Sequence, residues 1–192
     1  MRSRGISGAV PLSHFFLRER LQPGDRAVDA TCGNGYDTSF LARLVGPEGK
    51  VWAFDIQERA LIATEERLAR EGCRERVVLV HGGHERFAEV VTEPVRAVIF
   101  NLGFLPGTSR ETVTIPETTL AGLEQAGALL LPGGIIVVAV YTGHPGGVEE
   151  GDAVEGWAAS LAPARFNVWC CRQANRSGAA PYLFVVERSP VP

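Results

Sequence analysis

The sequence lacks any hydrophobic run long enough to cross a bilayer. The longest one, Ile135–Val140, has six residues, whereas a membrane helix needs about 20. Near the N-terminus the apolar residues 15–17 are followed at once by Arg18, Glu19 and Arg20, which is unlike the apolar core of a secretory signal. We therefore expect a cytoplasmic protein that does not associate with a membrane.

Lysine, cysteine and excess positive charge are also scarce. Lys50 is the only lysine among 19 basic residues, and the 22 acidic residues bring the net charge to −3. A general nucleic-acid coat protein would be basic, so this class is excluded, although a local basic patch stays possible. The four cysteines form no C-x-x-C motif, and Cys170 and Cys171 would point to opposite faces of one strand. We expect neither a disulfide framework nor a metal site.

The size and composition are those of one globular domain. The chain has 192 residues, of which 45% are hydrophobic and 21% are charged. This length supports one core but not two ordinary domains. We therefore treat residues 1–192 as a single domain.

Short apolar segments alternate with amphipathic ones along the chain. The expected strands are 27–30, 50–55, 76–81, 95–101 and 135–141. The expected helices are 37–45, 58–71, 85–91, 116–131 and 154–161. Strands joined by helices predict an α/β fold with a doubly wound, Rossmann-like parallel sheet. The last two strands, 165–173 and 182–188, have nothing helical between them and should form an antiparallel hairpin.

Two local signals bound the helix that begins at residue 116. Thr114 and Glu117 fit a capping box, with Pro116 in the first turn, where its missing N–H does no harm. The triplet Pro132–Gly134 should end this helix.

Ligands of doubly wound sheets bind beyond the carboxyl ends of the strands. The segments that follow the five strands are rich in glycine and polar residues, which indicates a site rather than a bare scaffold. They are 29–36, 55–57, 81–84, 101–107 and 141–146.

The first two of these segments predict an adenosine-containing ligand. Gly33 and Gly35 let a ligand approach the backbone where a helix begins. Asp55 ends the second strand, 20 residues beyond Gly35, where an acid can accept hydrogen bonds from both ribose hydroxyls.

The same region argues against a dinucleotide. It lacks G-x-G-x-x-G, and Asp29 and Asp37 would repel a diphosphate at the helix N-terminus. They suit a ligand with an ammonium group and no phosphate, such as S-adenosylmethionine. Asp37 could equally be a plain helix N-cap, and a nicotinamide-dependent oxidoreductase is the alternative enzyme class.

Several motifs together resemble a known family. The runs D-A-T-C-G-N-G-Y-D-T from Asp29, F-D-I-Q from Phe54 and N-L-G-F-L-P-G from Asn101 are similar to those of class I S-adenosylmethionine-dependent methyltransferases. With P-E-T-T from Pro116 and G-H-P-G-G from Gly143, they resemble a small bacterial family labelled ribosomal-RNA methylases. The similarity covers nearly the whole chain, in order.

The resemblance implies a fold, a substrate and an assembly. It implies a seven-stranded sheet with the last strand antiparallel and helices on both faces. It also implies N-methylation of 5-aminomethyl-2-thiouridine at the tRNA wobble position, and a homodimer. An N-terminal helical segment, residues 1–25, would cover the cofactor site.

The strand-end pattern and the resemblance give a set of expected contacts. Cofactor contacts are expected from Asp29, Thr31, Cys32, Gly33, Asn34, Gly35, Asp37, Thr38, Asp55, Ile56, Gln57, Gly83, His84 and Asn101. Substrate contacts are expected from Leu102, Gly103, Phe104, Pro106 and Arg110.

Asn101 and Phe104 hold places matching the N-P-P-Y loop of amino-methyltransferases, although both prolines are replaced. That resemblance implies that the Asn101 side-chain oxygen accepts a hydrogen bond from the target amine and that Phe104 stacks on the base. The plain alternative is a capped strand end with a core phenylalanine.

Three histidines could act as a base for the attacking amine. We favour His144, which follows the most apolar strand; His84 is expected to contact the cofactor, and His14 to be a surface residue. His81 is expected to have no role.

Two departures from the family pattern bear on the substrate, namely Ile115 in place of a lysine and a final loop, 175–181, that is poor in amides. The acidic balance keeps a small-molecule N- or O-methyltransferase open as an alternative, beside an rRNA methyltransferase. A cofactor-binding protein without activity is the remaining alternative.

Overall fold

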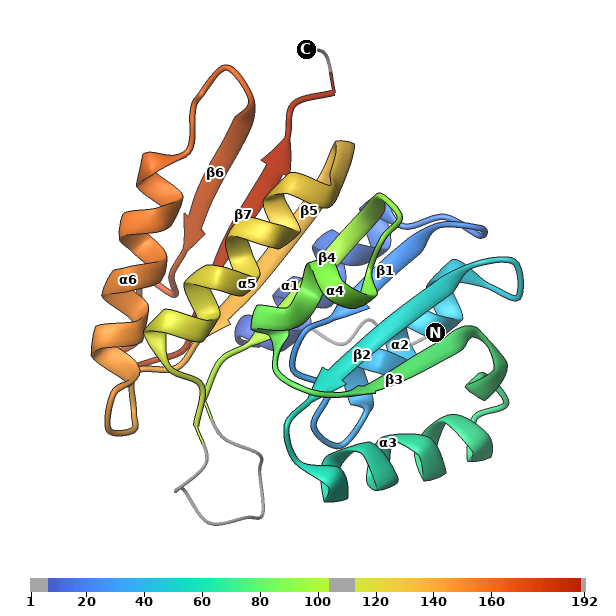
Figure 1. Ribbon diagram of the computed structural model, residues 1–192. Coiled ribbons are helices and arrows are strands. Elements are labelled where there is room, and N and C mark those ends of the chain that lie inside the picture. Colours follow the sequence, from blue (N-terminus) through green and yellow to red (C-terminus); the bar gives the residue numbers. More distant parts are fainter. Residues whose placement is uncertain (1–6, 104–112, 191–192) are drawn as a thin grey trace.

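The computed structural model describes residues 7–103 and 113–190. Its centre is a seven-stranded sheet in the order β3-β2-β1-β4-β5-β7-β6 (Figure 1). The strands are β1 (Arg26–Asp29), β2 (Lys50–Asp55), β3 (Val77–His81), β4 (Val95–Asn101), β5 (Leu130–Val140), β6 (Phe166–Cys171) and β7 (Tyr182–Arg188). The pairs β1–β2, β1–β4, β2–β3 and β4–β5 are parallel, whereas β7 runs antiparallel to β5 and β6. The doubly wound sheet and its antiparallel hairpin are confirmed.

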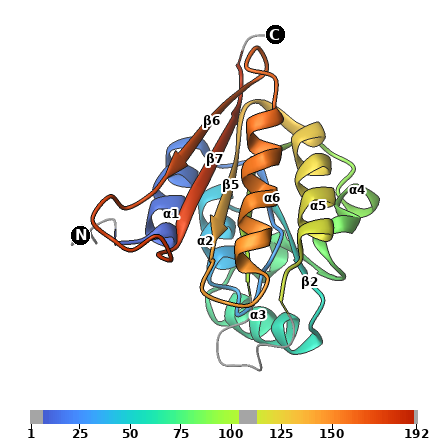
Figure 2. The same ribbon diagram turned by 90° about the vertical axis from the view of Figure 1, so that its left-hand side faces the viewer.

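Helices cover both faces of the sheet. One face carries α1 (Ala9–Arg20), α2 (Tyr36–Val45) and α3 (Glu58–Arg70); the other carries α4 (Phe87–Val90), α5 (Pro116–Leu129) and α6 (Gly147–Ser160). Figure 2, which views the sheet from its β6 edge, shows α1 on one side and α5 and α6 on the other. Each face has its own buried apolar cluster. No helix in the two described ranges is long and apolar enough to span a bilayer.

The central strands are buried because both of their faces are covered. All residues of Ile135–Val140 are at most 1% exposed, which is typical of parallel strands between two layers of helices. Successive side chains of this run enter opposite clusters, with Ile136 on the α5 side and Val137 on the α1 side. The continuous apolar run therefore reflects two cores, not one.

The end of α5 differs from the prediction. The helix ends at Leu129, and Leu130 already pairs with Val95 of β4. The Pro132–Gly134 triplet lies inside β5, where the register shifts before Ala97 pairs with Ile135. A bulge accommodates proline and glycines within a strand, so this triplet interrupts the strand and does not end the helix.

The predicted capping box is wrong as well. Ile115 is the N-cap of α5, and no side chain caps the helix. The Thr114 hydroxyl instead donates to Glu150 Oε2 at 2.7 Å and accepts from the Gly103 N–H at 2.7 Å. Glu150 is 1% exposed, and a buried carboxylate requires hydrogen-bond donors. The Thr114 hydroxyl therefore bonds to Glu150 and does not cap α5.

Candidate functional site

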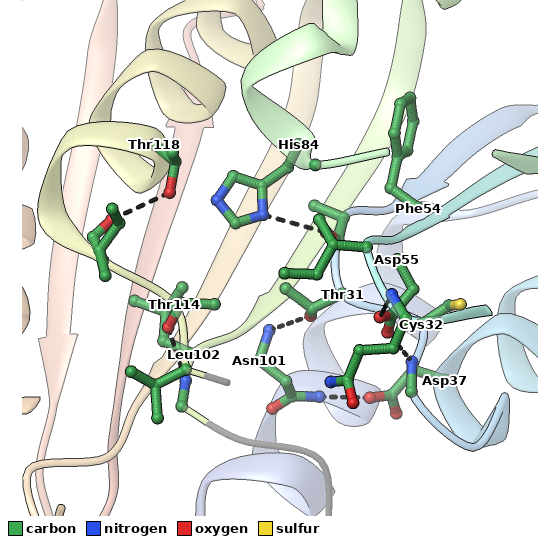
Figure 3. A pocket seen from close by; sticks show the side chains of 18 of the residues that line it. Thr31, Cys32, Asp37, Phe54, Asp55, His84, Asn101, Leu102, Thr114 and Thr118 are labelled. Atoms are coloured by element: carbon green, nitrogen blue, oxygen red, sulfur yellow. Dashed lines mark hydrogen bonds between the residues drawn. The ribbon is translucent and has the colours of Figure 1, made fainter. Parts of the chain in front are cut away.

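All five strand ends singled out in the sequence border one cavity of about 750 Å³. This volume is within the range of small-molecule and cofactor sites. Figure 3 shows its side chains converging from the sheet edge and from the first turn of α5. The lining residues are Val10, Ala30, Thr31, Cys32, Gly33, Asn34, Tyr36, Asp37, Phe54, Asp55, Ile56, Gln57, Gly82, Gly83, His84, Glu85, Asn101, Leu102, Gly103, Val113, Thr114, Ile115, Thr118, Tyr141 and His144.

The loop between β1 and α2 needs its glycines. Gly35 has φ of +75°, and a Cβ there would lie 2.9 Å from the Cα of Thr64. Thr64, on α3, also donates its hydroxyl to the Gly33 carbonyl at 2.9 Å. The loop is therefore pressed against α3, which leaves its other side open to the cavity.

Asp55 lies at the cavity edge with its carboxylate held by backbone. Its Oδ2 accepts from the Gly33 N–H and its Oδ1 accepts from the Gln57 N–H, both at 2.9 Å. Burial raises the pKa of Asp55, and the two backbone hydrogen bonds oppose that shift. Each oxygen keeps a lone pair for a further donor, so the carboxylate can still receive two hydroxyls of a ligand.

Asp29 lies beneath the cavity and does not line it. It is 1% exposed, and its carboxylate accepts from the Thr38 hydroxyl at 2.6 Å and from the Thr31 N–H at 3.2 Å. Burial and the nearby charge of Asp37 raise its pKa to about 7. Gly35 and Thr38 are likewise absent from the lining. Asp29, Gly35 and Thr38 therefore support the conformation of the loop and do not border the cavity.

Cys32 contributes to the wall as a thiol. Its side chain is 4% exposed. Burial, together with the negative charges of Asp29 and Asp55, raises its pKa. The thiolate is therefore disfavoured, and Cys32 behaves as a small apolar surface.

Asn101 ends β4 and faces the cavity. Its backbone N–H donates to Thr31 Oγ1 at 2.7 Å, and its side-chain Nδ2 donates to Asp37 Oδ2 (Figure 3). Its side-chain Oδ1 is buried and has no hydrogen-bond partner among the described residues. A buried acceptor without a donor is costly unless a ligand supplies one.

Asp37 is not the N-cap of its helix. Gly35 holds that position, and no side chain caps α2. Asp37 lines the cavity and pairs with His14 Nε2 at 2.5 Å through Oδ1. The His14 side chain is 24% exposed, and its imidazole stacks on Phe40 with centroids 3.8 Å apart.

His84 and His144 both line the cavity, and both are buried. His84 Nδ1 lies 3.2 Å from the Ala30 carbonyl, and burial lowers its pKa, which keeps the ring neutral. His144 Nδ1 lies 2.9 Å from the Pro145 carbonyl, and its Nε2 faces Gly103, where a Cβ would lie 3.4 Å away.

His81 is exposed and contacts the Ile56 carbonyl at 3.1 Å. It is absent from the cavity lining.

Some expected residues cannot be placed, and some lining residues were missed. Phe104, Pro106 and Arg110 lie outside the described residues. Ile115 and Thr118 reach the cavity from the first turn of α5, which no strand-end pattern indicates. Tyr141 directly follows β5 and could have been found by the same rule that found Asn101.

The residues fit an adenosyl ligand with a positively charged tail. The Asp55 and Asp37 carboxylates both line this cavity and offer acceptor oxygens. The backbone of Gly33 also lines the cavity. An array of this kind offers acceptors to hydroxyl and ammonium donors and gives no counter-charge for a diphosphate.

Comparison with known proteins agrees with this geometry. The sequence model of the family described as Putative rRNA methylase matches residues 51–187. A chloroplastic tRNA (mnm(5)s(2)U34)-methyltransferase from Arabidopsis thaliana is 38% identical over 196 residues, which cover 96% of this chain and 71% of the relative.

Solved structures agree in fold and sequence. A putative rRNA-methylase from Clostridium thermocellum superposes with a TM-score of 0.93 at 38% identity, covering 96% of this chain and 100% of that one. A putative methyltransferase from Streptococcus mutans, solved in complex with SAH, has a TM-score of 0.87 at 39% identity, covering 96% and 99%. This chain belongs to the Putative rRNA methylase family of class I S-adenosylmethionine-dependent methyltransferases.

Proposed function

We propose that this protein uses S-adenosylmethionine to methylate a nucleobase amine of RNA, specifically the 5-aminomethyl group of 2-thiouridine at the tRNA wobble position. The Arabidopsis relative, which aligns with 96% of this chain, bears the name of that activity. The hydrogen-bond acceptors that line the cavity support an amine as the group that receives the methyl.

The observation that carries the proposal is the Asn101 side-chain oxygen. It is buried at the end of β4, without a partner among the described residues, in the cavity wall. An acceptor oriented by the protein can receive an N–H of an incoming amine and so turn the nitrogen lone pair toward the transfer point. A substrate that is methylated on a hydroxyl oxygen would need this arrangement less, because a hydroxyl has only one proton to orient.

When bound, S-adenosylmethionine would supply a methyl group on a sulfonium, whose carbon the amine nitrogen attacks as the C–S bond breaks and a neutral thioether leaves. The protein must hold the amine at an approach of ~3 Å and accept its proton. An alkylammonium with a pKa of ~10 costs ~4 kcal/mol to deprotonate at neutral pH. A base that takes the proton offsets this cost.

His144 is the proposed proton acceptor. It is buried, lines the cavity beside Gly103, and has its Nδ1 against the Pro145 carbonyl. Nδ1 therefore contacts that carbonyl, and Nε2 is the ring nitrogen that faces Gly103. We propose that Nε2 takes the amine proton as the N–C bond forms.

The direct test is methyl transfer in vitro. The purified protein, labelled S-adenosylmethionine and tRNA carrying 5-aminomethyl-2-thiouridine should give a labelled, methylated wobble nucleoside by mass spectrometry. The matched control is the same tRNA without the aminomethyl group, which should take no label. Equal labelling of both tRNAs would contradict the wobble-uridine assignment.

Asn101→Ala separates a role in transfer from a structural one. We expect the affinity for S-adenosylmethionine to stay close to that of the wild type, while turnover falls by about 10- to 100-fold through loss of an oriented acceptor. Isothermal titration and single-turnover methyl transfer measure the two quantities. A parallel loss of both would mean that Asn101 only maintains the loop.

The acidic net charge of −3 favours a second candidate, a methyltransferase for a small amine or alcohol. Such an enzyme needs no long-range attraction of phosphates. It would methylate the free nucleoside as efficiently as the tRNA. An rRNA substrate, to which the family's description refers, would show itself by labelling of ribosomal RNA but not of tRNA.

We also propose that the protein acts as a homodimer in the cytoplasm, where tRNA is modified. One chain of this size offers little basic surface for an RNA stem, and a second copy would enlarge it. Light scattering after gel filtration and cell fractionation test the two statements. A monomer that still methylates tRNA would refute the dimer.

A further inference from the structure

The N-terminal helix α1 reaches the cavity through one polar contact. His14 Nε2 lies 2.5 Å from Asp37 Oδ1, and the side chains of the two residues are 24% and 12% exposed. The imidazole is also stacked on Phe40 of α2, with an interplanar angle of 6°. The stacking on Phe40 therefore fixes the plane of the imidazole, and the contact with Asp37 fixes the direction of its Nε2.

The opposite oxygen of Asp37 holds Asn101. Asp37 Oδ2 accepts from Asn101 Nδ2, and the two side chains face each other in Figure 3. A carboxylate can only accept, so this contact fixes which end of the amide faces Asp37. The Asn101 oxygen is therefore turned to the other side, where it is buried without a partner among the described residues.

We propose that His14 is a positioning residue, which acts through Asp37 to hold the Asn101 amide with its oxygen presented to the acceptor amine. The inference rests on the proposed function, because it assigns the acceptor role to Asn101. His14 supplies the donor that Asp37 Oδ1 uses, and so fixes the plane of the carboxylate. Without that donor the carboxylate can rotate away from Asn101, and the amide loses its orientation.

The ring stacking allows a test that separates packing from hydrogen bonding. His14→Phe keeps an aromatic ring on Phe40 but removes the donor to Asp37, so its melting temperature should stay near that of the wild type. His14→Lys returns a hydrogen-bond donor to this position, within reach of Asp37. Glu19→Gln, at an exposed position of the same helix, is the matched surface control.

Two readouts are measured on these variants. The first is kcat for methyl transfer together with the Kd for S-adenosylmethionine. His14→Phe should lower kcat by ~10-fold with little change in that Kd, and His14→Lys should recover most of the loss. The second is the ratio of the affinities for sinefungin and SAH, since sinefungin carries an amine in place of the transferable methyl and offers an N–H to Asn101 Oδ1.

The wild type should prefer sinefungin over SAH, and His14→Phe should lose ~10-fold of that preference. An unchanged preference and kcat in His14→Phe would overturn the proposal. Equal losses in kcat and in affinity for S-adenosylmethionine would also overturn it, because they would show a structural role.

The two proposals can fail separately. The sinefungin-to-SAH ratio needs no RNA, so it reports on the orientation of Asn101 even if tRNA is not the substrate. If the wild type fails to methylate tRNA while its sinefungin preference depends on His14, the proposed function fails and the positioning role stands. If tRNA is methylated and His14→Phe matches the wild type in both readouts, only the positioning role fails.

Discussion

Asp55 has each carboxylate oxygen held by one backbone N–H, at 2.9 Å. This arrangement sets the direction of the remaining lone pairs before a ligand arrives, which reduces the ordering needed on binding. We predict that Asp55→Ala weakens S-adenosylmethionine binding by about 1.5–3 kcal/mol, or roughly 10- to 150-fold in Kd. Isothermal titration measures it, and a change of less than about 3-fold would show that Asp55 does not hold the ribose.

Asp29 predicts a pH dependence of stability. Its pKa is raised from 3.8 to about 7 by burial and by Asp37, so between these values the folded protein keeps a proton that the unfolded chain has released. The group therefore stabilises the fold fully below about pH 4, and this contribution is lost as the pH rises through 7. Asp29→Asn, which stays neutral, should reduce the loss of unfolding free energy between pH 5 and 8 by up to about 3 kcal/mol.

Urea unfolding at the two pH values gives this difference for the wild type, for Asp29→Asn and for Asp152→Asn. Asp152 is exposed on α6, so its variant should behave as the wild type does. An Asp29→Asn protein whose stability falls with pH as steeply as that of the wild type would contradict the buried, protonated state of Asp29.

Residues could be predicted from the sequence where a short-range rule applied. Asp55 was found by its distance from Gly35, and Asn101 by its place at a strand end and by motif. The contact between His14 and Asp37 joins residues 23 positions apart on two helices, and it depends on how α1 packs across the sheet. No spacing in the sequence carries that information.

At the scale of elements, Glu150 of α6 binds two threonines at the start of α5. Its Oε1 accepts from the Thr119 hydroxyl and its Oε2 from the Thr114 hydroxyl, both at 2.7 Å. Thr114 in turn receives the Gly103 N–H, and the Gly103 carbonyl accepts from the Thr114 N–H at 2.9 Å. A buried carboxylate thereby connects Gly103, which follows β4, and Thr114, which precedes α5, to α6.

We predict that Glu150→Ala lowers the free energy of unfolding by about 1–3 kcal/mol, because two buried hydroxyls lose their acceptor. It should also raise KM for the proposed tRNA substrate more than Kd for S-adenosylmethionine. Denaturant unfolding and steady-state kinetics measure both effects. The control is Glu149→Ala, at the exposed neighbouring position, and equal behaviour of the two variants would refute the role of Glu150.

The errors in the predicted elements share a cause. Thr114 fits a capping box by sequence, yet a buried carboxylate from α6, 36 residues away, recruits its hydroxyl. The Pro132–Gly134 triplet has the signal of a helix end, yet pairing with β4 draws Leu130 into a strand before it. Local propensity loses in both places to a tertiary contact, whereas the long apolar and amphipathic segments were identified correctly.

At the scale of the whole molecule, the order of the strands determines where the candidate site lies. Parallel strands bring the ends of β1, β2, β3, β4 and β5 to one edge, where their following loops border a single cavity. The alternation of strand and helix was therefore sufficient to locate the site, although not to orient its side chains. The orientation of the Asn101 amide depends on its contact with Asp37, which only the folded chain brings about.

The most direct measurement of the central claim is the nucleoside content of tRNA in cells that lack this protein. Mass spectrometry of digested tRNA should show 5-aminomethyl-2-thiouridine accumulating and its methylated form disappearing, with recovery when the wild-type protein, but not Asn101→Ala, is returned. Unchanged levels of the methylated wobble nucleoside in the deletion strain would contradict the account.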